Sequence, residues 1–159
     1  MNIIELFEKL DIDKNSILLF SAEDIMRVEK MLNVEKRINP KIDSNTGENL
    51  ITALKNCKEE LLFVMSNHIL FNFFTHNNFS KNQFLSYNLT VSDDRIKNFI
   101  ELFLADDLIS FFSLKLSKNT YNDLEELDSV LDLKRYFPEE IIYKMACFFI
   151  LNLILLFLS

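Results

Sequence analysis

Glycine and proline, the residues that most often mark turns, are almost absent from this chain. Its 159 residues include one glycine, Gly47, and two prolines, Pro40 and Pro138. Tight turns between β-strands usually need glycine for a positive φ angle, so this composition favours helices over hairpins. A single glycine also excludes glycine-rich phosphate-binding loops, and with them the P-loop and Rossmann classes of nucleotide enzyme.

Cysteine and positive charge are also scarce. The two cysteines, Cys57 and Cys147, form no CxxC pair, which predicts neither a zinc ligand set nor a disulfide framework. The net charge of −7 argues against nucleic acid as a partner, because phosphate binding requires a basic surface. The first residues contain no basic segment ahead of an apolar run, so we expect no signal peptide and predict a cytoplasmic protein.

Apolar residues recur at helical spacing along most of the chain. Ser21 followed by Asp24 has the pattern of a capping box and predicts a helix that ends at Asn39 and Pro40. Pro138 followed by two glutamates predicts the start of the last helix. The other predicted helices cover residues 2–10, 44–57, 61–74, 80–87, 92–112 and 120–131.

We therefore expect an all-α fold, with residues 1–159 forming a single-domain bundle of about seven to eight helices and a strongly apolar C-terminal helix. No linker or internal repeat marks a domain boundary. One alternative keeps two short strands, at Ile17–Phe20 and Phe112–Ser117, because both segments are compatible with β-structure.

The two histidines lie in an apolar segment that the sequence predicts to be one helix. On such a helix His68, Asn72, Thr75 and His76 would share a narrow polar stripe. The i,i+8 spacing separates the two rings by about 12 Å along the axis, too far for one metal ion, and no acid or cysteine shares the stripe. A structural role is favoured, and catalysis through a distant Ser or Cys is the alternative.

The segment after the first predicted helix resembles the start of a calcium-binding loop. Asp11, Asp13 and Asn15 occupy its first three ligand positions. Ser16 then replaces the required glycine, and Ala22 replaces the closing glutamate that supplies two oxygen ligands. We therefore expect no calcium site and no other metal or cofactor.

The segment Asn122–Asp132 is strongly acidic and contains no basic residue. Most charged helix faces are simply exposed to solvent. The alternative is a docking surface for a basic protein, in which Asp123, Glu125 and Glu126 would orient the partner.

The segment Met145–Ser159 is almost entirely apolar. As a helix from Met145 to Leu158 it would extend about 21 Å, short of a bilayer core of about 30 Å. This favours a buried helix over a membrane anchor. Because other predicted helices are also apolar nearly all round, part of this surface is expected to meet another chain, through Phe148, Leu151 and Leu155.

These patterns predict a non-catalytic protein-binding protein. It would be a small acidic subunit of a larger assembly or an inhibitor of a basic protein, a role similar to immunity proteins and antitoxins. The partner would be a basic protein or a second copy of the chain. The alternative is a membrane-attached protein anchored through residues 145–159, and an enzyme that uses His68 or His76 is less favoured.

Overall fold

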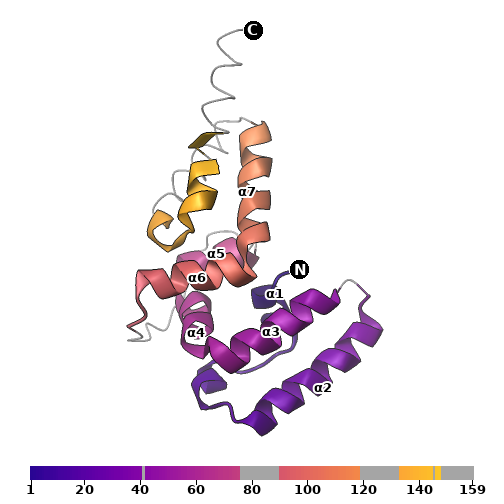
Figure 1. Cartoon of the computed structure of the whole chain (residues 1–159). Coiled ribbons are helices and arrows are strands. Elements are labelled where there is room, and N and C mark those ends of the chain that lie inside the picture. The colour runs from indigo at the N-terminus through magenta and orange to yellow at the C-terminus, as the bar shows by residue number, and fades with distance from the viewer. Residues whose placement is uncertain (41, 76–89, 119–132, 145, 148–159) are drawn as a thin grey trace. The chain divides into compact units, whose positions relative to one another are not determined.

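The computed structural model describes residues 1–40, 42–75, 90–118, 133–144 and 146–147 (Figure 1). Every regular element in these ranges is helical, which confirms the all-α prediction. The alternative with two short strands is wrong: Phe112–Ser117 lies within an α-helix, and Ile17–Phe20 overlaps a 3-10 helix. The apolar C-terminal helix and the helices expected at 80–87 and 120–131 lie outside the described residues.

The described residues form the following helical elements. In chain order they are α1 (Ile3–Lys9), the 3-10 helix η1 (Lys14–Leu19), α2 (Ala22–Ile38), α3 (Ser44–Asn56), α4 (Lys58–Ser66), α5 (His68–Thr75), α6 (Asp93–Phe103), α7 (Ala105–Lys118) and the 3-10 helix η2 (Lys134–Tyr136). Residues 139–144 are also helical. The nine elements named here, all within the described residues, are close in number to the seven to eight helices expected.

The contacts divide the chain into two compact units, an N-terminal unit of Met1–Arg95 and a C-terminal unit of Ile96–Ser159. In the N-terminal unit α1 packs against α3 and α5, α4 packs against η1 and α5, and α2 lies along α3 (Figure 1). That all 159 residues form one domain stays a prediction.

The core of the N-terminal unit contains side chains from each of its first six helical elements. Those that are completely buried include Ile4, Leu6, Phe7, Ile17, Leu50, Leu54, Leu61, Val64, Met65 and Leu70. Burying each large aliphatic or aromatic side chain contributes about 1.5–3 kcal/mol to folding, so this shared core holds the unit together.

Hydrogen-bonded caps fix where the helices of this unit begin. Ser21 and Asp24 form the predicted capping box at the start of α2, and the helix ends at Asn39 as expected. Asp43 caps α3 through the backbone N–H groups of Asn45 and Thr46. Each cap supplies acceptors to N–H groups that have no partner within their own helix.

Two predicted helices are each divided in two. The helix expected over 61–74 is interrupted at Asn67, whose Oδ1 accepts hydrogen bonds from Ile69 N at 3.2 Å and Leu70 N at 3.1 Å. Asn67 therefore ends α4 and starts α5. The helix expected over 92–112 is likewise interrupted at Leu104, between α6 and α7.

The C-terminal unit has its own apolar contacts. The α7 residue Phe112 meets Phe137 edge to face, with ring centroids 6.3 Å apart, and both side chains are buried. The Pro138 carbonyl accepts hydrogen bonds from Ile141 N and Ile142 N, which confirms the predicted helix start. The course of that helix after residue 147 lies outside the described residues.

Candidate functional site

The predicted partner-binding residues are not among those the structure describes. Asp123, Glu125 and Glu126 belong to residues 119–132, and Phe148, Leu151 and Leu155 belong to residues 148–159. Their part in partner binding stays a prediction.

His68 is the first residue of α5, and it is partly buried. The described members of the predicted polar stripe, His68, Asn72 and Thr75, lie together on α5, while His76 lies outside the described residues. Farther along α5, Asn72 is buried, and the Thr75 hydroxyl donates to Phe71 O at 2.8 Å. Within the described ranges, no three His, Cys, Asp or Glu side chains gather as a metal site.

The calcium-loop-like residues take part in local turn structure. Asp13 caps η1, and its Oδ1 accepts hydrogen bonds from Asn15 N at 3.0 Å and Asn15 Nδ2 at 2.8 Å. Asp11 follows the end of α1 with φ 51°, the left-handed conformation that aspartate tolerates better than most residues. Asp13 and Asn15 therefore bond to each other.

Glu60 and Arg95 form a partly buried ion pair in the N-terminal unit. Glu60 Oε1 lies 2.6 Å from both Nε and Nη2 of Arg95, while Nη1 of Arg95 lies 2.8 Å from Glu59 Oε2. Hydrogen bonds to Glu60 and then to Glu59 raise the pKa of Arg95. The pair joins α4 to the first turn of α6. That turn ends at Arg95 and belongs to the N-terminal unit.

Cys57, the cap residue ahead of α4, lies in the electrostatic environment of this ion pair. Burial raises the pKa of its thiol, and the negative charge of Glu60 raises it further, against an opposing effect of Arg95. A raised pKa keeps the thiol protonated at neutral pH, and the protonated thiol is a poor nucleophile. The environment therefore argues against Cys57 as a catalytic nucleophile.

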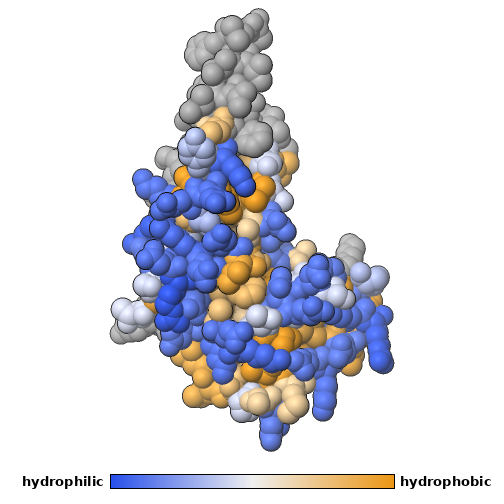
Figure 2. Space-filling model, viewed as in Figure 1, coloured by the Kyte–Doolittle hydropathy of each residue, from blue (hydrophilic) through white to orange (hydrophobic). Residues whose placement is uncertain are grey.

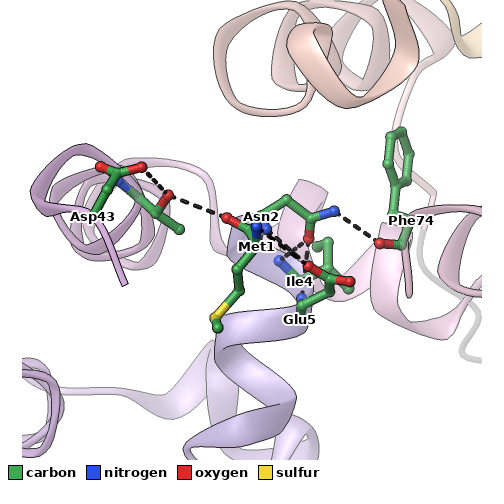
Figure 3. Close-up of polar contacts among 7 residues, drawn as sticks. Met1, Asn2, Ile4, Glu5, Asp43 and Phe74 are labelled. Carbon is green, nitrogen blue, oxygen red and sulfur yellow. Dashed lines mark hydrogen bonds and ion pairs between the residues drawn. The ribbon is translucent and has the colours of Figure 1, made fainter. Parts of the chain in front are cut away.

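Figure 3 shows a second polar cluster, around Asn2. Asn2 Oδ1 accepts hydrogen bonds from Ile4 N and Glu5 N, both at 3.0 Å, while its Nδ2 donates to Phe74 O at 2.8 Å. The Thr46 hydroxyl lies 3.2 Å from Met1 O and 3.0 Å from Asp43 Oδ2. These bonds tie the start of α1 to α3 and to the end of α5, which is a structural role.

An open groove of about 480 Å³ lies between α2 and α3. Figure 2 shows hydrophobic surface between hydrophilic areas where these two helices lie side by side. The polar residues that line it are Glu29, Asn33, Lys36, Glu48, Thr52 and Lys55. Its two acids and two bases balance, and Lys55 Nζ bonds Glu29 Oε1 at 3.1 Å, so the groove has no net charge that favours one class of ligand.

The most unusual described surface is the outer side of α2. The helix buries Ile25, Val28 and Leu32, and the helix that it packs against is α3. Met31, Val34 and Ile38 are exposed by 42%, 56% and 73%. We call these three residues the outer stripe; at about 100° per residue they fall within about 60° of arc, away from the buried face.

Basic side chains lie along one edge of the outer stripe and at its N-terminal end. Arg27, Lys30 and Arg37 are all exposed, and Lys30 and Arg37 are one heptad apart on the same edge of the stripe. Arg27 Nη1 lies 3.3 Å from Asp24 Oδ1. Within the described part of the chain, no acidic side chain pairs with Lys30 or Arg37. Glu35, on the other edge, bonds Lys9 at 2.8 Å.

This surface was not predicted from the sequence, although the signal was present. Met31, Val34 and Ile38 recur at i, i+3 and i+7, which is the spacing of a second apolar face on the same helix. Periodicity identifies both faces but does not say which one packs inside. Only the packing of α2 on α3 distinguishes them.

No protein-family model matches this chain, and no curated protein or solved structure shows significant similarity to it. In the described ranges, no helix has both the length and the apolar character needed to cross a bilayer.

Proposed function

We propose that this chain is a non-catalytic protein-binding protein, a small acidic helical subunit of a larger assembly or an inhibitor of a basic protein. The observation that carries the protein-binding part of this proposal is the outer stripe of α2. Three large apolar side chains on one side of a capped, well-packed helix leave exposed surface that a partner would bury.

The charge of the chain supports a basic protein among its partners. With a net charge of −7, the chain attracts a basic surface at long range, which accelerates their encounter. It repels an acidic surface, which slows encounter. The residues proposed to orient that partner are Asp123, Glu125 and Glu126, and those proposed for the apolar contact are Phe148, Leu151 and Leu155.

Affinity purification from the native source tests the proposal. We expect a basic protein to co-purify in fixed stoichiometry and to re-form the complex when both purified proteins are mixed. The isosteric variant Asp123→Asn/Glu125→Gln/Glu126→Gln should weaken the reconstituted complex, because it removes three negative charges at nearly constant shape. Glu23→Gln/Glu48→Gln/Glu101→Gln, which removes three exposed charges elsewhere, serves as the control.

Equal weakening by both triple variants would show that net charge alone acts, and that the 122–132 segment is no docking surface. Recovery of the chain as a monomer, without a stoichiometric partner, would contradict the protein-binding function itself.

A further inference from the structure

From the geometry of α2 we infer that its outer stripe docks an acidic amphipathic helix of a partner protein. The inference rests on the proposed protein-binding function and specifies the partner's chemistry at this one surface. A stripe with apolar residues at i, i+3 and i+7 is one heptad long, and a second helix with the same spacing packs well against it.

The basic side chains beside the stripe favour a partner helix that carries negative charge. Arg27, Lys30 and Arg37 are exposed beside it, and Lys30 and Arg37 have no acidic partner among the described residues. This is a basic edge on a chain whose net charge is −7. Glutamates or aspartates flanking the partner's apolar residues would pair with it, whereas lysines would be repelled.

A second copy of α2 fits the stripe less well. Parallel pairing would place Arg27 of one copy against Arg27 of the other, at an inward position of the seam. Antiparallel pairing would bring the edges that carry Lys30 and Arg37 to the same side of the interface. Both arrangements bring like charges together.

An anionic membrane surface also fits less well than a helix. Basic amphipathic helices bind such surfaces through a large apolar face, and this stripe supplies only Met31, Val34 and Ile38. The chain as a whole is acidic, so an anionic bilayer would repel most of the molecule.

Two synthetic helical peptides test the inference with the full-length protein. Both carry leucine at i, i+3 and i+7, and they differ only in having glutamate or lysine at the flanking positions. We expect the glutamate peptide to shift the NMR amide signals of residues 27–38 and to bind at least about tenfold tighter than the lysine peptide, a difference of about 1.4 kcal/mol. Added salt should reduce this preference.

Variants of exposed residues locate the contact without disturbing the core. Val34→Asp should abolish binding of the glutamate peptide. Lys30→Glu/Arg37→Glu should reverse the preference in favour of the lysine peptide. Met26→Asp is the matched control, because Met26 is 51% exposed on the same helix but lies about 80–140° away from the stripe.

Three results would overturn the inference. The first is equal binding, or no binding, of the two peptides. The second is concentration-dependent self-association of the protein that Val34→Asp removes, which would assign the stripe to a second copy. The third is binding only to vesicles of anionic phospholipid. Each of these leaves the co-purification of a basic protein as a separate test, so failure here is distinguishable from failure of the proposed function.

Discussion

Arg95 contacts only one oxygen of the Glu60 carboxylate: Nε and Nη2 both lie 2.6 Å from Oε1, and Oε2 is buried without a hydrogen-bond partner among the described residues. The two side chains differ in solvent access, because that of Glu60 is 9% exposed whereas that of Arg95 is 49% exposed. Removing Arg95 and removing Glu60 should therefore lower the stability of the protein by different amounts.

We expect Arg95→Leu to lower Tm by several degrees, because it leaves a buried carboxylate without its counter-ion. Glu60→Leu should have a clearly smaller effect, since Arg95 keeps Glu59 and access to water. Thermal unfolding of the two variants and of the double variant measures the difference. An equal loss of Tm in the two single variants would contradict this account.

Asp43 should account for part of the stability that the protein loses at acid pH. Hydrogen bonds from the backbone and side chain of Thr46 and from Asn45 N lower the pKa of Asp43 below its ordinary value of 3.8. A lowered pKa in the folded state means that the unfolded state binds more protons. The stabilising contribution is therefore complete well above pH 3.8 and is lost as the pH falls through the folded-state pKa.

Asp43→Asn should leave stability at neutral pH nearly unchanged, because asparagine is an equally good helix cap. Its side-chain N–H can bond the Thr46 oxygen, whose hydroxyl then donates to Met1 O. The loss of stability towards acid pH should be smaller than in the wild type, as measured by urea unfolding at several pH values. Glu48→Gln removes one exposed charge of the same helix and should not change the acid response.

The hydrogen bond from Asn2 to Phe74 O predicts that aspartate is not tolerated at position 2. Asn2→Asp keeps the acceptor for Ile4 N and Glu5 N but replaces the Nδ2 donor with an oxygen, 2.8 Å from a carbonyl oxygen. Asn2 is buried, so we expect a loss of about 2–3 kcal/mol in the free energy of unfolding. Asn45→Asp, at an exposed position, is the control. A loss no larger than that of the control would show that the bond to Phe74 contributes little.

Gly47 offers a stabilising substitution. It lies within α3 with no positive φ, and a Cβ atom there would come within 2.9 Å of Lys36 Cε and Nζ and 3.3 Å of Leu32 Cδ2. The end of the Lys36 side chain is flexible and can move aside. Gly47→Ala should therefore gain about 0.5 kcal/mol in the free energy of unfolding from helix propensity. A destabilised protein would show that Lys36 or Leu32 cannot shift.

The sequence predicted the helices that have strong local signals. Ser21 and Asp24 marked the start of α2 because a capping box involves only neighbouring residues, and Pro138 marked the last helix for the same reason. The break at Asn67 was missed, because asparagine is compatible with a helix interior and becomes a cap only when the chain turns.

The candidate site was less predictable than the fold. Met31, Val34 and Ile38 show the same helical spacing as the buried residues of α2, so composition and period do not separate core from surface. The partners of Glu60 and Asn2 could not be predicted from the sequence either. Arg95 and Phe74 are each brought to them by the packing of other helices, not by local sequence.

The bond between Asn2 and Phe74 also bears on the order of folding during synthesis. Ribosomes extend the chain from the N-terminus, so α1 emerges long before α5, the helix that supplies its partner carbonyl 72 positions later. Until then Ile4, Leu6 and Phe7 lack part of the surface that covers them in the native unit. The earliest-made helix of the N-terminal unit is thus among the last to complete its contacts, and its apolar residues stay incompletely covered until both α3 and α5 have been synthesised.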